Sequence, residues 1–213
     1  MKTDALIASL SAGIRPVRPG GVGRRLAAGL AAGAIATLVI LSLTLGFRPD
    51  LWVAMHGPTF WMKWAYTSSL ALAAITVTAK LARPDPGSLR ALWLLLVPVA
   101  FLAAIGALDL ARTPRSDWLA MWLGKTWLIC PWLVLFLATP IFVGLLWSFR
   151  RLAPTRLRAA GAAAGLSAGA FAATIYCLHC PEVSAIFVLT WYSLGILLAA
   201  SVGALIGPRL LRW

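Results

Sequence analysis

The chain is poor in charged residues, and acids are the scarcest. Only 12% of its 213 residues are Asp, Glu, Lys or Arg, and just 6 are acidic, whereas an ordinary soluble domain is about 25% charged. Hydrophobic residues make up 61%, and the mean hydropathy is +0.88. This composition excludes a soluble globular enzyme, and it excludes intrinsic disorder, which requires low hydrophobicity. It also excludes an outer-membrane barrel, whose strands are short alternating segments rather than long apolar runs.

Six apolar runs are each long enough to cross about 30 Å of hydrocarbon, which takes roughly 20 helical residues. The runs cover residues 26–47, 60–81, 91–111, 122–147, 157–178 and 183–206. We therefore predict an all-α, polytopic membrane protein with a six-helix transmembrane bundle over residues 26–213. The first run is too long for a signal-peptide core and has no small-residue cleavage site, so we expect it to be retained.

The interiors of these runs lack Asp, Glu, Arg and His. Charges inside a membrane usually mark transport or proton pathways, so their absence argues against an ion-coupled transporter, a proton pump or a voltage sensor. Lys63 and Lys125 lie within about one turn of the outer interface, and we expect both side chains to extend to water.

The distribution of basic residues predicts the orientation. With the N-terminus inside, the inner segments carry 14 Lys and Arg residues and 2 acidic residues. The outer segments then carry 5 Lys and Arg residues and 4 acidic residues. Because basic residues accumulate on the cytoplasmic side, we expect both termini in the cytoplasm. Residues 1–25 then form a separate cytoplasmic segment before the bundle.

Small residues recur every four positions on the last two predicted helices. They are Gly161, Gly165 and Gly169 on the fifth, and Gly195, Ala199, Gly203 and Gly207 on the sixth. Such spacing lets helix backbones approach closely in lipid, so we predict that these two helices pack together.

Three cysteines are an odd number, so at least one thiol lies outside any intramolecular disulfide. Cys177 and Cys180 flank the outer turn between the fifth and sixth helices, and Cys130 lies in the outer half of the fourth. All three are expected on the extracytoplasmic side, which in a bacterial inner membrane faces the oxidising periplasm.

The two turn cysteines differ in their expected electrostatics. Cys180 is predicted to cap the sixth helix, with Pro181 at its first position and Glu182 behind it. A helix N-terminus lowers the pKa of a thiol, and His179 next door can assist. Cys177 ends the preceding helix and is expected to be a buried hydrophobe. Cys180 is therefore the better candidate for a reactive thiol.

Depth leaves the pairing of Cys130 open. It lies eight residues past Trp122, about 12 Å along a helix that rises 1.5 Å per residue. Cys180 is expected near the interface, whereas Cys177 lies one turn deeper and matches Cys130 better. A kink at Pro131 or a later start of the fourth helix would bring Cys130 closer to the depth of Cys180.

The CxxC spacing also suits other interpretations. Thioredoxin-type enzymes place this motif at a helix N-terminus, whereas here its first cysteine ends a helix. Membrane disulfide oxidases relay electrons through two cysteine pairs, and three cysteines make only one. A metal site would combine Cys177, His179 and Cys180 with His56 or Cys130. An inert role for the thiols is a further alternative, because buried cysteines are commonly unreactive.

The cytoplasmic segment contains a short amphipathic helix near its start. Its candidate partner-binding residues are Thr3, as the N-cap, followed by Asp4, Leu6, Ile7 and Leu10. The three apolar side chains share one face. Such a helix either lies on the membrane or docks in the hydrophobic groove of a partner, and the residues alone leave both open.

Six motifs are spread along the whole chain. They are Met1-Lys2-Thr3-Asp4, Arg48-Pro49-Asp50-Leu51, Cys130-Pro131, Leu178-His179-Cys180-Pro181-Glu182, Trp191-Tyr192 and Gly207-Pro208-Arg209. In these motifs the chain resembles the NrsF-type negative regulators of an extracytoplasmic-function sigma factor. The His-Cys-Pro-Glu turn is the most specific of them.

The resemblance implies a six-helix protein of the bacterial inner membrane that holds its sigma factor inactive. It implies that the two family cysteines, which fall on Cys130 and Cys180, form the sensor, and that their oxidation or attack by heavy metals releases the sigma factor. Cys177 is then an alternate thiol, and His179 a modulator of the pair. The resemblance also implies that the cytoplasmic N-terminal segment contacts the sigma factor.

We therefore predict a membrane-bound anti-sigma factor rather than an enzyme, with no catalytic residue, cofactor, metal or direct nucleic-acid contact. Its partners are an extracytoplasmic-function sigma factor and the lipid bilayer. Two hypotheses of other classes accompany it. A membrane thiol–disulfide oxidoreductase would copurify with quinone or turn over a dithiol, and a small-molecule or metal transporter would show uptake in proteoliposomes.

Overall fold

The computed structural model describes residues 3–12, 20–85, 88–150 and 152–212. Every regular element in these residues is a helix, which confirms the predicted all-α class. The long helices are α2 (Gly21–Thr44), α4 (Pro58–Leu81), α5 (Trp93–Arg112), α7 (Cys130–Phe149), α8 (Leu157–Tyr176) and α10 (Ser193–Leu210). The short ones are α1 (Thr3–Ser11), α3 (Leu51–His56), η1 (Leu89–Leu92), η2 (Arg115–Asp117), α6 (Trp118–Leu123), α9 (Ala185–Phe187) and the π-helical turn η3 (Val188–Tyr192).

Within the described part of the chain, five helices are long and apolar enough to cross a membrane. They are Gly21–Thr44, Arg90–Arg112, Cys130–Phe149, Leu157–Tyr176 and Ala185–Leu210, the last joining α9, η3 and α10. The first begins at Gly21, several residues before the predicted start at residue 26. The remaining long helix, α4, has 24 residues but is not among the five. The count of six spans therefore stays a prediction.

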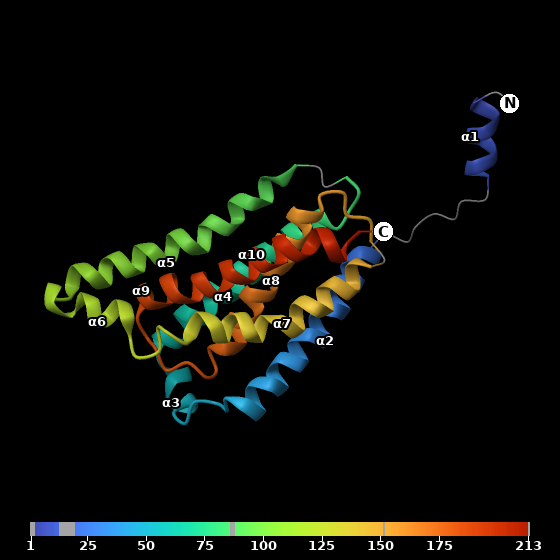
Figure 1. Cartoon of the computed structure of the whole chain (residues 1–213). Helices are drawn as coiled ribbons and strands as arrows, with labels where there is room; N and C mark the ends of the chain where they lie inside the picture. The colour runs from blue at the N-terminus through green and yellow to red at the C-terminus, as the bar shows by residue number, and fades with distance from the viewer. Residues whose placement is uncertain (1–2, 13–19, 86–87, 151, 213) are drawn as a thin grey trace.

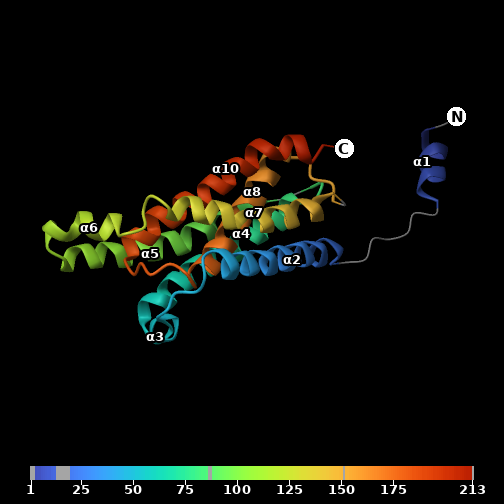
Figure 2. The ribbon, with the colours of Figure 1, turned by 60° about the horizontal axis from the view of Figure 1, so that its bottom comes forward.

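Helix α8 lies at the centre of the bundle (Figures 1 and 2). It packs against α2, α4, α7 and α10, while α5 lies outermost and packs mainly on α4. The sequence explains this position, because α8 consists largely of Ala and Gly and lets four neighbours approach its backbone.

The close approach of α8 and α10 depends on glycine. A Cβ atom on Gly161 would collide with the carbonyl oxygen of Gly203, and a Cβ on Gly203 would collide with that of Gly161. The predicted packing of these two helices is confirmed. Helices α2 and α7 meet in the same way, since Gly29 and Gly144 each face the other's carbonyl oxygen.

Helix α4 is less apolar than the other long helices because part of its polar surface is used inside the bundle. The Thr78 hydroxyl bonds to that of Ser167 on α8 at 2.9 Å, and the Tyr66 hydroxyl bonds to that of Ser193 on α10 at 2.6 Å. Hydrogen bonds between membrane helices contribute roughly 0.6 kcal/mol each. These contacts join α4 to the two helices at the centre.

The fourth predicted helix does not run unbroken from Trp122. Helix α6 ends at Leu123, and α7 begins only at Cys130. Gly124 between them has a φ of 57° and a ψ of −160°, a backbone conformation that only glycine adopts readily. The Trp122 and Trp127 rings on either side of this break both pack against Trp191. The expected span of residues 122–147 is therefore wrong at its start.

Candidate functional site

Cys130 is the first residue of α7, and Pro131 follows it in the first turn. Its backbone N–H donates to the Thr126 carbonyl at 2.9 Å. Cys130 therefore lies at the junction between the loop after α6 and helix α7. The depth argument, which counted eight helical residues from Trp122, is therefore wrong. Proline without an N–H is well suited to this first turn.

Cys177 directly follows α8, and Cys180 lies three residues further on in the turn toward α9. The Cys180 N–H donates to the Tyr176 carbonyl at 3.0 Å. The prediction that Cys180 caps the next helix is wrong. That cap is Ser184, whose hydroxyl accepts from the Phe187 N–H at 3.3 Å, and α9 begins at Ala185. Serine outcompetes cysteine as an N-cap because its oxygen is the stronger acceptor.

All three cysteines are free thiols and fully buried, with 0% exposed surface. Cys130 and Cys180 are brought together, near enough for each thiol to influence the ionisation of the other. Cys177 points back into the bundle, where its thiol donates to the Ala173 carbonyl at 3.3 Å. The hydroxyl of Tyr192 is buried without a hydrogen-bond partner among the described residues, and an ionised Cys180 would give it an acceptor.

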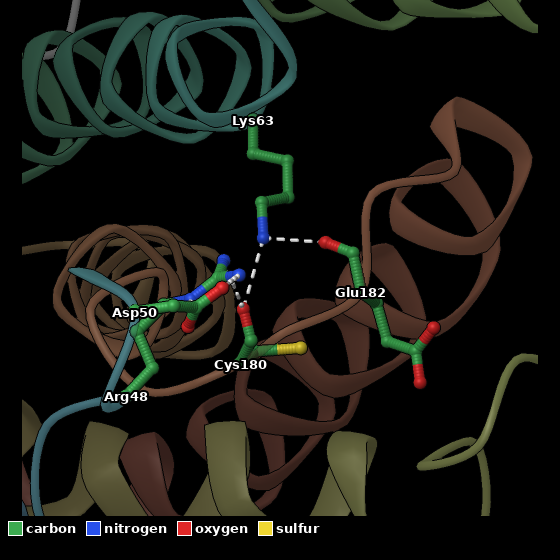
Figure 3. Close-up of polar contacts among 5 residues, drawn as sticks. All are labelled: Arg48, Asp50, Lys63, Cys180 and Glu182. Atoms are coloured by element: carbon green, nitrogen blue, oxygen red, sulfur yellow. Dashed lines mark hydrogen bonds and ion pairs between the residues drawn. The ribbon is translucent and has the colours of Figure 1, made fainter. Parts of the chain in front are cut away.

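Lys63 is the feature of the site that sequence reasoning missed. Its side chain is fully buried rather than extended to water. The ammonium donates to the carbonyl oxygens of Cys180, at 3.0 Å, and Glu182, at 2.5 Å (Figure 3). The prediction failed because the turn after α8 folds over the start of α4 and supplies two acceptors closer than the interface.

Arg48 approaches the same turn from the loop after α2. Its guanidinium forms an ion pair with Asp50 at 2.6 Å and also donates to the Cys180 carbonyl at 3.5 Å. Its backbone N–H donates to the Leu178 carbonyl at 3.1 Å. The hydrogen bond with Asp50 raises the pKa of Arg48, and the reciprocal bond lowers the pKa of Asp50.

Glu182 ties the cysteine turn to the loop before α7. One carboxylate oxygen accepts from the Lys125 N–H at 2.7 Å and from the Thr126 N–H and hydroxyl, each at 3.2 Å. A Cβ at Gly124 would collide with the Glu182 side chain, so glycine allows this approach. Because charge-assisted bonds are the strongest class of hydrogen bond, Glu182 holds the segments that carry Cys130 and Cys180 side by side.

The pKa values of Cys177 and Cys180 are shifted in opposite directions. The hydrogen bond from Cys130 lowers the pKa of Cys180 to about 6, and the positive charge of Lys63 acts in the same direction against the effect of burial. Burial raises the pKa of Cys177 to about 11. The lower pKa falls on Cys180, although the cause is not a helix N-terminus. That Cys180 is the reactive thiol stays a prediction.

The histidines do not join the thiols. The His179 ring bonds to the Gly46 carbonyl at 3.0 Å and so joins the turn to the loop after α2. The His56 ring bonds to the Trp52 carbonyl at 2.7 Å within α3. Over the described residues no three His, Cys, Asp or Glu side chains converge as metal ligands would, so the hypothetical four-ligand site is not assembled.

The candidate partner-binding residues all lie on α1, which buries no side chain. They are Thr3, Asp4, Leu6, Ile7 and Leu10, and all five are exposed. Thr3 is the first residue of the helix, and residues 1–2 lie outside the described part of the chain.

Comparison with known proteins identifies the family. The sequence profile of NrsF, described as negative regulator of sigma F, matches residues 10–213. The chain belongs to the NrsF family. The probable anti-sigma-F factor NrsF of Azospira oryzae is 42% identical to it over 214 residues, and the anti-sigma-F factor NrsF of Caulobacter vibrioides is 39% identical over 219 residues. Both alignments cover 100% of this chain and 100% of the relative. No solved structure matches the chain.

Membership of the NrsF family confirms the resemblance seen in the motifs. The family consists of negative regulators of a sigma factor, a role that is not enzymatic. The oxidoreductase hypothesis is thereby set aside, and the thiols are to be understood as part of a regulator.

Proposed function

We propose that this protein is a redox-gated anti-sigma factor of the bacterial inner membrane. It sequesters an extracytoplasmic-function sigma factor at the cytoplasmic face while Cys130 and Cys180 are thiols, and releases it when they are oxidised. The observation that carries the proposal is the proximity of these two buried free thiols, in a member of the NrsF family.

The chemistry requires a two-electron oxidant such as a hydroperoxide. The Cys180 thiolate attacks one peroxide oxygen, the O–O bond breaks, and the leaving oxygen takes a proton. Cys180 is then a sulfenic acid. Cys130 attacks this sulfur, the S–S bond forms, the S–O bond breaks, and water leaves with the Cys130 proton. Both thiols together lose two electrons, which the peroxide gains.

Heavy metals would act on the same pair, because thiolates are ligands for soft metal ions. In this proposal Cys177 is an alternate thiol that stays protonated, held by its bond to Ala173. His179 is a modulator, because its bond to Gly46 fixes the turn that carries Cys180.

The proposal includes six crossings of the membrane, with α4 as the additional one. Its 24 residues make about 36 Å of helix at 1.5 Å per residue, enough to cross. The lower hydropathy of α4 is compatible with a crossing, because the hydroxyls of Thr78 and Tyr66 form hydrogen bonds to α8 and α10. An even number of crossings puts both termini on the same side, and the basic inner segments favour the cytoplasm.

The partner surface in this proposal is the exposed face of α1. Leu6, Ile7 and Leu10 are 41%, 59% and 68% exposed. An exposed apolar face of this kind is typical of an interaction site. An amphipathic helix of this kind docks in a hydrophobic groove, and we assign that groove to the sigma factor.

The deciding experiment is capture of the sigma factor encoded beside this protein, using the detergent-solubilised full chain. We expect capture under reducing conditions and its loss after peroxide. The double variant Cys130→Ser, Cys180→Ser is expected to capture in both conditions, because no disulfide can form. Leu10→Asp is expected to weaken capture at least about tenfold in both, since it places a charge on the docking face.

Cys177→Ser is the matched control, because it also removes a buried thiol from this end of the bundle, and it is expected to respond to peroxide like the wild type. A Cys130→Ser, Cys180→Ser protein that still releases its partner on oxidation would refute the disulfide switch. Absence of capture from the reduced wild type would refute the anti-sigma role itself.

A further inference from the structure

A buried lysine at the thiol site has no acid to pair with. The Lys63 side chain has 0% exposed surface, and its ammonium reaches two neutral acceptors, the carbonyl oxygens of Cys180 and Glu182 (Figure 3). An ammonium withdrawn from water loses several kcal/mol of hydration, which a protein normally offsets with a nearby negative charge. The two carbonyls supply hydrogen bonds but no charge.

The neighbouring carboxylates are engaged elsewhere. Asp50 forms its ion pair with Arg48 and acts on Lys63 only from further away, and among the described residues no carboxylate oxygen lies within 4 Å of the Lys63 ammonium. The Glu182 carboxylate faces away in Figure 3 and is held by Lys125 and Thr126. A thiol, that of Cys180, is a further group close to Lys63 that can become an anion.

We propose that Lys63 is a positioning residue of the redox sensor, and that its buried positive charge favours the thiolate form of Cys180 while its hydrogen bonds hold the Cys180–Glu182 turn over α4. The inference rests on the proposed function only in taking Cys180 as the thiol that is oxidised. It adds a residue from helix α4 to the sensor and assigns it a chemical role.

Cys180 has other titratable neighbours, and each has a different effect. Arg48 is neutralised by Asp50. Cys130 from α7, Tyr176 from α8 and Tyr192 from η3 are neutral groups, and an ionised sulfur would offer each of them an acceptor.

Cys177 lies in the same turn as Cys180, and its own thiol feels the Lys63 charge as well. Burial nevertheless keeps the pKa of Cys177 high. Lys63 therefore supplies a positive charge near Cys180 that, unlike Arg48, forms no ion pair with a carboxylate among the described residues.

The test is a thiolate titration in the full chain. A parent protein with Cys130→Ser and Cys177→Ser keeps only Cys180, and serine at 130 retains a hydroxyl donor. Thiolate formation is followed by ultraviolet absorbance against pH, with a further Cys180→Ser variant as the blank. We expect the Cys180 pKa of the parent to lie well below the ordinary value of about 8.5.

Lys63→Gln keeps an N–H donor for the two carbonyls but removes the charge. We expect it to raise the Cys180 pKa by about one unit or more, a tenfold fall in the ratio of thiolate to thiol at any given pH. Lys63→Arg keeps the charge and is expected to retain the low pKa. Lys125→Gln is the matched control, because it removes an equal charge from an exposed side chain on the same loop cluster, and it is expected to leave the titration unchanged.

Three outcomes would overturn the inference. They are a parent thiol that titrates at its ordinary value, a Lys63→Gln protein that titrates like the parent, and a Lys63→Arg protein that shifts as far as Lys63→Gln. The first needs no change at Lys63, so it decides the question even if the variants do not fold. Because the titration involves no sigma factor, it fails or succeeds independently of the capture experiment.

Discussion

Cys180 owes its environment to residues that are distant in the sequence. Its sulfur meets Cys130 from α7, and its carbonyl oxygen meets Lys63 from α4 and Arg48 from the loop after α2. The sequence predicted a reactive Cys180 from a helix N-terminus. The direction of the pKa shift was correct, whereas the cause was wrong, because an N-cap is a local feature and these contacts are not.

The low pKa of Cys180 predicts a pH profile for disulfide formation in the wild type. Below about pH 6 the sulfur is protonated and a poor nucleophile, so the rate should rise with pH through 6 and level off above it. Cys177, with a pKa of about 11, should stay unreacted over this range. Gel mobility after timed peroxide exposure measures the rate.

The control for this profile is Cys177→Ser, which is expected to give the same curve. A rate that climbs only through about pH 8.5, the ordinary value for a thiol, would contradict the environment described for Cys180.

At the scale of helices, the α8–α10 contact should tolerate no added side chain. Gly203→Ala places a methyl group against the Gly161 carbonyl, and a backbone oxygen cannot turn aside as a side chain can. We expect a loss of about 1–3 kcal/mol, the usual cost of overpacking. The three buried thiols provide the measurement, since a thiol-reactive dye reports their exposure on heating in detergent.

The matched control is Ser201→Thr, which adds one carbon on the exposed side of the same helix. It should leave the unfolding temperature unchanged. Equal destabilisation by both substitutions would mean that α10 itself, rather than its contact with α8, is sensitive to added volume.

The helices could be predicted where local sequence determines them, as in the long apolar runs and the regularly spaced glycines. Apolar runs of about 20 residues gave the long helices, and glycine spacing predicted the α8–α10 contact, which the Gly161–Gly203 approach confirms. The break between α6 and α7 was missed. It depends on Gly124 and on the Glu182 carboxylate that binds the following N–H groups, and the apolar run through this region concealed both.

At the scale of the whole molecule, the number of crossings decides which side each end faces. Reporter fusions that distinguish cytoplasm from periplasm, placed after residue 83, after residue 113 and at the C-terminus, should report inside, outside and inside. Six crossings also require α2 and α4 to run in opposite directions. A fusion after residue 83 on the side opposite the N-terminus would remove α4 from the set of crossings.

The all-α membrane class could be predicted from the sequence, but the positions of the helices relative to one another could not. Composition and charge indicated a helical membrane protein with a basic inner side, whereas the central place of α8 follows from its Ala and Gly content, which lets four helices meet it. The burial of Lys63 could not be predicted, because it requires knowing that the turn after α8 covers the start of α4.

Helix α2 connects the two ends of the molecule in a mechanical sense. The residues that follow it, Gly46 and Arg48, are hydrogen-bonded to the cysteine turn, and its other end begins at Gly21. Along its length it lies on α7, the helix that starts with Cys130. A single continuous helix of 24 residues thus connects the cysteine turn with Gly21. A movement of the cysteine turn would therefore act directly on one end of a 24-residue helix whose other end is Gly21.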